Sequence, residues 1–373
     1  MNGKPDSAKR LLLIVYSNLE PGGIPAKIID IVNVMRIKKP DTPIVILLQK
    51  GHPGDLRSLI ANPNVLINDF PYPYPMGRRF FFTLWLWLFI LTQKPAAILV
   101  FISPYALPVL AFKFLFFWQK FRVIVSEDHY TQTLLNRMAY PVVQRWGIRL
   151  LYPLADAVIV PTHVLKHQLL QLSTIPEEKI RVVPNWTRFA AMPLKKSRRT
   201  IDIIHIGRLV KSKNPLYVVR IMHRYIKEID NTARCAVVGD GPEVKSLERY
   251  IRRHQLQNNI QLFPATNDVS EFLLKAKIFL FLPESRTEGF PIILLDAMAC
   301  GDIVITKQFD GVNEVIRHGK NGFVYRRITD LFQSLRRATR GGKLIAAAQR
   351  QTSSDVANNN SLKNIEGYLS FMI

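Results

Sequence analysis

Short apolar runs that alternate with amphipathic segments constrain this chain more than any other feature of its sequence. The pattern opens with an apolar run at 11–16, a segment of helical periodicity at 26–36 and a second apolar run at 44–48. Such an alternation is typical of βαβ units, in which crossover helices join parallel strands. Further apolar runs follow at 97–101, 123–125, 157–160 and 180–183. The pattern therefore predicts an α/β fold.

The same pattern begins again after residue 200, which indicates a second domain. Residues 187–200 lack periodic apolar positions, and the sequence predicts a linker at 191–200. A length of 373 residues also favours two domains. We expect them at 1–190 and 201–350, followed by a tail at 351–373 that returns to the first domain as a helix. Two doubly wound domains would face each other across a cleft at the carboxyl ends of their strands, where ligands bind.

Basic residues outnumber acidic ones by 51 to 28, which leaves a net charge of +23. About half of this excess lies in residues 1–190, so the charge is spread along the chain rather than gathered in a tail. Nucleic acid, an anionic membrane surface and a phosphorylated substrate are all candidate partners. The two cysteines, Cys235 and Cys300, exclude a disulfide framework or a four-cysteine zinc site and indicate a reducing, cytoplasmic compartment.

The most apolar stretch, residues 80–92, is shorter than the ~20 residues that a membrane-spanning helix needs. Residues 1–9 are polar, so no secretory signal is expected. Arg78 and Arg79 precede the apolar stretch, and further basic residues flank an aromatic run at 112–118. Two interpretations remain open: a pair of core-facing helices, or a surface at the lipid headgroups. In the second, the protein would lie peripherally on the inner face of the cytoplasmic membrane.

A strand, a loop and a helix follow one another in residues 279–301, FLFLPESRTEGFPIILLDAMACG. Pro291 suits a first helical position. The backbone amides of Gly289, Phe290 and the residues after Pro291 would then lie at a helix N-terminus. Free amides at such an end bind anions and hydroxyl oxygens.

Two carboxylates accompany this turn. Glu288 stands directly before it, and Asp296 lies eight residues further on. A pair of carboxylates at one helix mouth suits recognition of sugar hydroxyls, because each accepts hydrogen bonds from two of them. Alternatively, Glu288 could only favour the helix dipole and Asp296 could belong to a solvated face.

Two further loops follow predicted strands of the second domain. Gly207, Arg208 and Lys213 come after the strand at 201–206, and a guanidinium beside an ammonium matches a diphosphate. In so basic a chain either cation could also be an ordinary loop residue. The second loop, VVGDGP at 237–242, joins a strand to a proline-started helix and is a common turn by itself.

The order and spacing of these motifs resemble the retaining glycosyltransferases of family 4, or glycosyl transferases group 1, which have the GT-B fold. The resemblance covers residues 201–325, and 155–158 and 183–185 also resemble the end of the family's first domain. The motifs that carry it are 207–209 with Lys213, 238–242, and 288–301 with its two acids.

The resemblance implies two Rossmann-like domains, the first for the acceptor and the second for a nucleotide sugar. Arg208 and Lys213 would hold the donor's diphosphate as it departs. Glu288 would lie beside the donor sugar, and the backbone of Gly289 and Phe290, just before Pro291, would lie against the sugar and phosphate.

Two positions depart from the family's pattern. Asp296, which by resemblance takes the ribose hydroxyls, stands where the family has glutamate. Its reach is shorter by one methylene, which bears on the ribose contact and the donor preference. Asn214 stands where the family commonly has glycine.

In the first domain, Gly22 and Gly23 resemble the family's glycine-rich loop, which approaches a phosphate or an acceptor. His129, which follows a buried strand and two acidic residues, resembles the family's histidine near the reacting sugar. A plain turn and a paired surface histidine are the alternatives.

The resemblance implies a hexosyltransferase that retains the anomeric configuration. We favour a UDP-sugar over a GDP-sugar as donor, and a glycan or lipid-linked acceptor in polysaccharide or lipopolysaccharide biosynthesis. No Asp-x-Asp triplet occurs in the chain, so neither a metal nor a cofactor is expected, and the cations and the helix mouth would stabilise the leaving diphosphate.

Three other functions were weighed. A nicotinamide-dependent dehydrogenase would want a G-x-G-x-x-G loop after the first strand, and Gly22 and Gly23 do not supply one. A basic nucleic-acid-binding protein would interleave aromatic and basic residues, whereas the aromatic residues here lie mostly in apolar runs. A nucleotide-sugar epimerase or a phosphorylase of similar architecture stays open.

Overall fold

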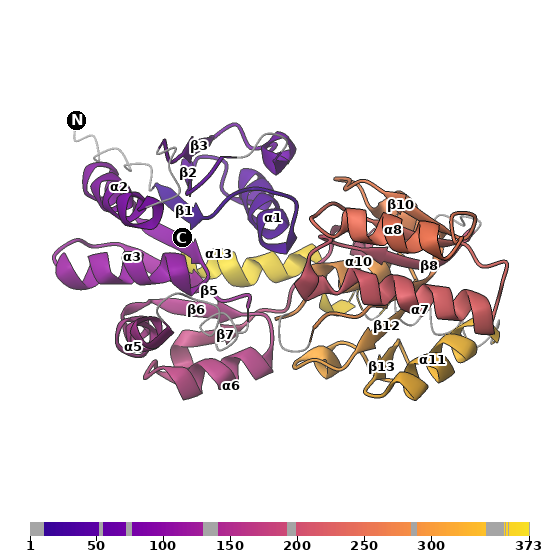
Figure 1. Ribbon diagram of the computed structural model, residues 1–373. Helices are drawn as coiled ribbons and strands as arrows, with labels where there is room; N and C mark the ends of the chain where they lie inside the picture. Colours follow the sequence, from indigo (N-terminus) through magenta and orange to yellow (C-terminus); the bar gives the residue numbers. More distant parts are fainter. Residues whose placement is uncertain are drawn as a thin grey trace. The chain divides into compact units, whose positions relative to one another are not determined.

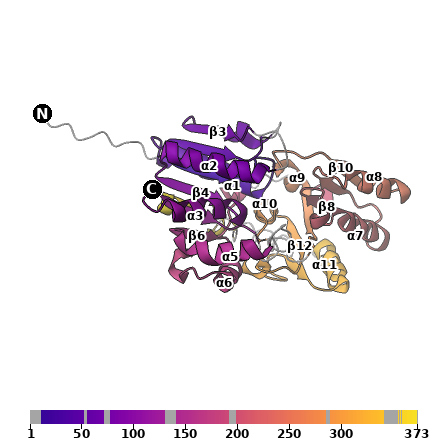
Figure 2. The ribbon, with the colours of Figure 1, turned by 60° about the vertical axis from the view of Figure 1, so that its left-hand side comes forward.

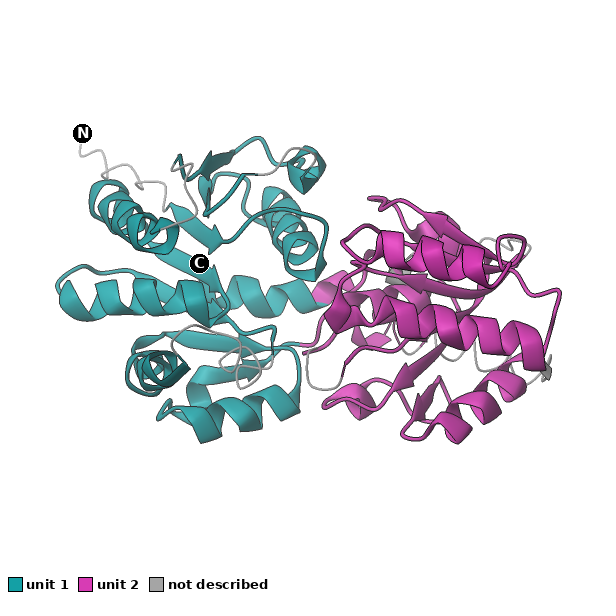
Figure 3. Cartoon of the chain, viewed as in Figure 1, with its two compact units in different colours: residues 1–183, 364–373 teal, residues 184–363 magenta. Residues whose placement is uncertain are grey.

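The computed structural model divides the chain into two compact α/β units (Figures 1 and 3). Unit 1 comprises Met1–Val183 and Asn364–Ile373, and unit 2 comprises Pro184–Lys363. The structure describes residues 11–51, 55–71, 77–129, 141–191, 199–284, 289–340, 354, 356 and 358–372.

Unit 1 is built on a seven-stranded sheet in the order β3-β2-β1-β4-β5-β6-β7, with all neighbours parallel. Strands β2, β4 and β6 are buried along their whole length, since helices cover both faces of the sheet. The strands are β1 (Leu12–Tyr16), β2 (Ile44–Leu48), β3 (Val65–Asp69), β4 (Ala97–Phe101), β5 (Arg122–Ser126), β6 (Ala157–Val160) and β7 (Ile180–Val182).

Four helices form a layer on one face of this sheet and share a single apolar core with it. They pack in the order α2, α3, α5, α6, which Figures 1 and 2 both show. Their bounds are α2 (Arg78–Gln93), α3 (Ser103–Leu115), α5 (Pro141–Leu151) and α6 (His163–Leu172).

Helices α1 (Gly23–Lys38) and α13 (Glu366–Met372) cover the other face. Val125 belongs to the core under the helix layer, and alternate side chains of a strand point to opposite faces. The neighbouring Ser126 hydroxyl lies 2.9 Å from the Tyr368 hydroxyl of α13. Lys27 of α1 donates to the same Tyr368 oxygen at 3.3 Å. The last helix of the chain therefore completes unit 1.

Unit 2 has a six-stranded parallel sheet in the order β10-β9-β8-β11-β12-β13. Separate apolar cores lie on its two faces. The strands are β8 (Ile201–Ile206), β9 (Cys235–Val238), β10 (Ile260–Phe263), β11 (Ala276–Phe281), β12 (Ile303–Lys307) and β13 (Phe323–Tyr325). The helices are α7 (Pro215–Glu228), α8 (Val244–Arg253), α9 (Ser270–Lys275), α10 (Ile292–Ala299) and α11 (Ile328–Arg340).

The division between the units falls at Val183–Pro184, before the linker that the sequence predicts at 191–200. Asn185 and Thr187 explain the difference, because both hydrogen-bond to residues of unit 2. Within the predicted linker, residues 192–198 lie outside the described part of the chain.

Candidate functional site

The strand order of unit 2 reverses beside β8, because β9 lies on one side of it and β11 on the other. The loops that follow β8 and β11 leave the carboxyl edge toward opposite faces of the sheet. In open α/β sheets this point is where ligands bind. The structure places Gly207, Arg208 and Lys213 in the first of these loops, and Gly289 and Phe290 at the end of the second. These five residues of the predicted donor site therefore share one edge of the unit 2 sheet, whereas Gly22 and Gly23, also predicted to bind the donor, lie in unit 1.

The two loops make direct contact. The backbone amide of Glu284 donates to the Ser212 carbonyl at 3.0 Å. The Lys213 ammonium lies 5.3 Å from the centre of the Phe281 ring at the end of β11. Lys213 is partly buried, whereas the Arg208 side chain is exposed. One cation is thus held at the junction of β8 and β11, and the other stands beside it in solvent.

His205 lies in β8, just before the loop that carries these cations. The sequence did not indicate it as a residue of the site. Its Nδ1 lies 2.9 Å from the Leu280 carbonyl oxygen, and since a carbonyl only accepts, Nδ1 carries the hydrogen. Burial lowers the pKa of His205 to about 4, opposed by this hydrogen bond and reinforced by the charge of Lys213. The ring is therefore neutral at physiological pH. Its buried Nε2 has no hydrogen-bond partner in the described part of the chain.

The glycines of the VVGDGP turn are required by the loop after β8. A Cβ on Gly239 would lie 2.0 Å from the Gly207 carbonyl oxygen, and one on Gly241 would lie 2.4 Å from that of Leu209. Both glycines also have positive φ, at 147° and 153°. The backbone of residues 207–209 therefore packs directly against Gly239 and Gly241. This close packing explains why the motif after β8 and the VVGDGP turn occur together.

Asn214 has left-handed backbone angles, φ 55° and ψ 45°, and caps α7 directly after Lys213. Glycine adopts this conformation without strain, and asparagine is among the few other residues that visit it routinely. The departure from the family's glycine therefore leaves the turn intact.

Helix α10 begins at Ile292, so Pro291 is its N-cap residue and not, as the sequence predicted, its first helical residue. Pro291 has ψ 122°, an extended value that a residue outside the helix adopts. The N-cap residue has no side-chain acceptor for this end, and the amides of Ile292 and Ile293, which precede the first hydrogen-bonded amide at Leu294, suit an anion or a hydroxyl. Gly289 and Phe290 are buried. Glu288 lies outside the described residues.

The segment that opens unit 2 fixes this helix, a role that sequence reasoning missed. Asn185 Nδ2 donates to the Phe290 carbonyl at 2.8 Å. The Thr187 hydroxyl donates to Asp296 Oδ1 at 2.5 Å, so Asp296 is oriented and partly buried rather than solvated. Asn360 joins both, because its Nδ2 donates to the Asn185 carbonyl at 2.7 Å and its carbonyl accepts from the Thr187 amide at 2.9 Å. The only sequence signal was the likeness of 183–185 to the family.

In unit 1 the strand order reverses between β1 and β4. Gly22 and Gly23 follow β1 at this point and begin α1, whose N-terminus has no side-chain cap. Gly22 has an extended φ of 175°, and the nearest atoms to an added Cβ are 3.7 Å away. The fold of unit 1 therefore does not require glycine at position 22.

His129 is partly buried and follows β5 at the same edge of the unit 1 sheet. The residue before it, Asp128, is buried and paired with Lys27 of α1. Burial lowers the pKa of Lys27, but the Asp128 carboxylate and the Tyr368 hydroxyl outweigh this, so the pKa lies above its ordinary value. A buried ion pair thus joins the first turns of α1 to the segment that carries His129.

Glu127, on the other side of Asp128, is buried and accepts a hydrogen bond from the Tyr152 hydroxyl. The pKa of Glu127 is raised to about 8, because burial and the negative charge of Asp128 outweigh the Tyr152 hydrogen bond, which lowers it. The carboxyl is therefore largely protonated at neutral pH.

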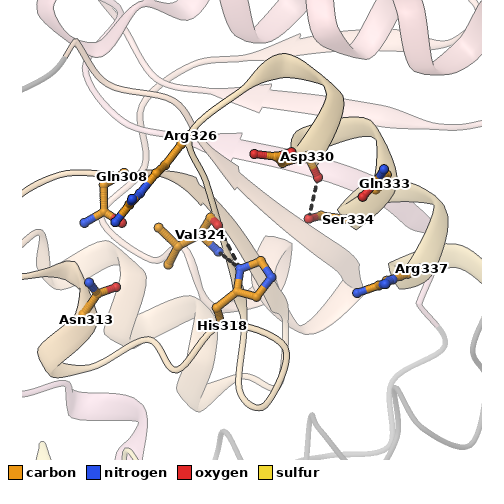
Figure 4. Close-up of a pocket in the computed structure, with 9 residues that line it drawn as sticks. All are labelled: Gln308, Asn313, His318, Val324, Arg326, Asp330, Gln333, Ser334 and Arg337. Atoms are coloured by element: carbon orange, nitrogen blue, oxygen red, sulfur yellow. Dashed lines mark hydrogen bonds between the residues drawn. The ribbon is translucent and has the colours of Figure 1, made fainter.

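A cavity of about 380 Å³ lies at the carboxyl ends of β12 and β13, beside α11 (Figure 4). Its walls are polar, with His318, Arg326 and Asp330 among them, and it contains none of the residues predicted from the sequence. Within the described ranges no cluster of His, Cys, Asp and Glu could hold a metal ion. None of the helices in those ranges is long and apolar enough to span a membrane.

Solved structures share the fold of this chain. Anabaena Alr3699/HepE in complex with UDP has a TM-score of 0.77 at 16% identity, covering 97% of this chain and 98% of that one. Sucrose-phosphate synthase from Thermosynechococcus elongatus has a TM-score of 0.80 at 13% identity, with 97% of each chain covered. The fold of this chain is the GT-B fold of glycosyltransferases.

Two family models match the sequence. Residues 44–190 match Glycosyltransferase Family 4, and residues 191–340 match Glycosyl transferases group 1. The chain belongs to glycosyltransferase family 4.

Curated relatives match shorter stretches. N-acetyl-alpha-D-glucosaminyl L-malate synthase of Bacillus anthracis is 32% identical over 122 residues, which are 33% of this chain and 31% of that protein. The putative colanic acid biosynthesis glycosyltransferase WcaL of Escherichia coli is 31% identical over 165 residues, 42% of this chain and 40% of that protein. The matches thus span only a third to two fifths of these relatives.

Proposed function

We propose that this chain transfers a hexose from a nucleotide-diphosphate sugar, preferentially a UDP-sugar, to a glycan or lipid-linked acceptor with retention of configuration. The observation that carries the proposal is the junction of β8 and β11. There two cations of one loop and the N-terminus of α10 lie at the same edge of a parallel sheet. This arrangement suits a diphosphate, whose charge grows as it leaves the sugar.

Each element of the donor site has a task in this mechanism. The Lys213 ammonium acts as a point charge on one phosphate, and the Arg208 guanidinium pairs bidentately with the other. The first amides of α10 add further donors without needing a metal ion. Asp296, which Thr187 holds in place, accepts from the ribose hydroxyls. Glu288 is assigned to the donor sugar by its place in the motif.

Unit 1 is proposed to hold the acceptor. Gly22 and Gly23 leave room for a ligand to approach the backbone at the start of α1, and unit 1 itself makes no use of this freedom at Gly22. His129 is proposed to contact the reacting sugar, positioned by the ion pair of Asp128 and Lys27.

The names of similar proteins support a role in surface polysaccharide or lipopolysaccharide biosynthesis. They include the colanic acid glycosyltransferase WcaL and the lipopolysaccharide outer core galactosyltransferase WaaB, and a complex of HepE with UDP-glucose. An acceptor of this kind places the enzyme at the inner face of the cytoplasmic membrane, with no nucleic-acid partner.

Thermal stabilisation by UDP, GDP and ADP, each alone and as its sugar conjugates, tests donor binding. A ligand at a hundred times its dissociation constant adds ~2.7 kcal/mol of stability, so UDP should raise the unfolding temperature most. No shift with any nucleotide would refute the proposal.

Sugar transfer from a radiolabelled donor tests the roles of individual residues. Arg208→Ala and Lys213→Ala should each lower turnover at least ~100-fold, in line with the loss of one donor to a developing charge. Lys211→Ala is the matched control, since Lys211 is an exposed lysine of the same loop, and should stay within about twofold of wild type. Equal activity in all three variants would refute the diphosphate assignment.

A further inference from the structure

Helix α2 has two opposite apolar stripes. Phe82, Leu86 and Ile90 face the core, where four-residue spacing keeps them on one side of the helix. Among the residues that face outward, Phe80 is 62% exposed and Leu88 is 59% exposed. The sequence left open whether this segment faces the core or lies on the surface, and α2 does both. The inner stripe builds the core of unit 1, and the outer stripe has no counterpart in the described part of this unit.

The outer stripe continues across the neighbouring helices. Helices α2, α3 and α5 lie side by side in the layer on one face of the unit 1 sheet (Figures 1 and 2). Helix α5 adds a surface that the sequence did not indicate, since Ile148 is its one buried residue. Further exposed apolar residues of this layer are Phe81, Leu84, Phe114, Leu115, Phe117, Trp118, Val142, Val143, Trp146 and Leu150. We call this surface, with Phe80 and Leu88, the outer helix face.

The charged side chains of helices α2, α3 and α5 have one sign. Between Asp69 and Asp156 the sequence holds only two acidic residues, Glu127 and Asp128, and both are buried. The exposed basic residues of the same stretch include Arg79, Lys94, Lys120, Arg145 and Arg149. The Arg149 guanidinium lies 5.7 Å from the centre of the Trp146 ring, so on α5 one cation lies against an aromatic ring.

We propose that the outer helix face docks onto an anionic lipid bilayer, with its aromatic and aliphatic side chains in the headgroup boundary and its arginines on lipid phosphates. Amphipathic elements with this composition lie in the membrane interface, and each basic residue near an anionic surface adds to the attraction. A second copy of the chain is disfavoured, because a symmetric contact would set arginine against arginine. Nucleic acid is disfavoured because Leu and Val do not stack on bases.

Vesicle co-sedimentation of the full chain tests the proposal. Vesicles of phosphatidylcholine with 30% phosphatidylglycerol should bind the chain, binding should weaken as salt is raised, and vesicles of phosphatidylcholine alone should bind at least tenfold less. Negligible binding to both, or equal binding to both, would overturn the proposal. UDP binding measured on the same preparation keeps this outcome separate from the proposed transferase function.

Two charge-reversal variants test whether binding depends on the outer helix face or only on the net positive charge of the chain. Arg145→Glu with Arg149→Glu on α5 should reduce binding at least tenfold. Arg249→Glu with Arg253→Glu on α8 is the matched control, since both are exposed, four residues apart and change the net charge equally; it should change binding less than twofold. Equal losses in the two variants would overturn the proposal.

A double substitution of two exposed leucines tests whether apolar side chains of the outer helix face enter the bilayer. Leu84→Ser with Leu88→Ser should reduce binding at unchanged net charge, whereas Ile37→Ser, at an 80% exposed position of α1, should not. Thermal midpoints confirm that each variant is folded. If the wild-type chain bound RNA but not vesicles, and the α5 variant no longer bound RNA, the outer helix face would be a nucleic-acid site and the proposal would be wrong.

Discussion

Replacing Glu127 by glutamine should make unit 1 more stable at alkaline pH. The Glu127 carboxyl is fully enclosed and accepts from the Tyr152 hydroxyl, and burial raises its pKa from 4.5 to about 8. Glutamine keeps the carbonyl oxygen that Tyr152 needs and has no proton to lose. The variant therefore removes the titration and little else.

The sign of the effect follows from which state holds the proton. Between about pH 4.5 and pH 8 the folded chain keeps the Glu127 proton and the unfolded chain releases it. Stability falls with rising pH wherever the folded state binds more protons, so the Glu127 contribution declines through this window and levels off above pH 8. The window spans about 3.5 pH units, and each is worth about 1.4 kcal/mol, which gives at most about 5 kcal/mol.

Urea unfolding of wild type and Glu127→Gln from pH 5 to pH 9 measures the effect. The difference in unfolding free energy should grow in favour of the variant up to pH 8 and then stay constant. Glu177→Gln is the control, because Glu177 is exposed and its pKa is lowered by Lys166, so it does not titrate in this range. Parallel curves for wild type and Glu127→Gln would refute the assignment of a buried, protonated carboxyl.

Three further substitutions test unit 2. Gly241→Ala should lower stability by at least about 2 kcal/mol in urea unfolding, because its Cβ would collide with a backbone carbonyl and its φ is positive. Thr187→Val keeps the side-chain shape and removes the donor to Asp296, so calorimetric titration should show UDP binding weakened about fivefold, in line with the loss of one hydrogen bond. Arg199→Met leaves the buried Asp302 carboxyl without its partner and should lower stability by about 3–5 kcal/mol in the same urea assay.

The strands buried on both faces could be predicted to the residue. The predicted runs 44–48, 97–101, 157–160 and 201–206 coincide with β2, β4, β6 and β8. A strand covered on both faces reads as an unbroken apolar run, and this signal is local.

Two strands at the sheet edges, β3 and β13, could not be predicted in this way. Strand β3 (Val65–Asp69) is only partly buried and reads VLIND, and β13 has three residues. Helix α9 passes directly into β11 at Ala276, without a turn residue to mark the boundary.

The donor loops were predictable because they follow strands whose carboxyl ends meet at one edge. The residues that hold these loops and the N-terminus of α10 in place could not be predicted. Asn185 and Phe290 lie 105 residues apart in the sequence, and Thr187 and Asp296 lie 109 apart. No local pattern reports such contacts, and only the folded chain shows that the opening segment of unit 2 orients the helix mouth.

The place of α13 has a consequence for the order in which the protein is made. Unit 2 lies within a single stretch of chain, whereas unit 1 needs both Met1–Val183 and the final helix. A ribosome therefore synthesises the whole of unit 2 before it reaches Tyr368, whose hydroxyl accepts a hydrogen bond from the buried lysine of α1. Until α13 has emerged, the part of the unit 1 sheet that it covers beside α1, at β4 and β5, stays open to water. A separately expressed fragment of residues 1–183 would have the same defect and would be prone to aggregate.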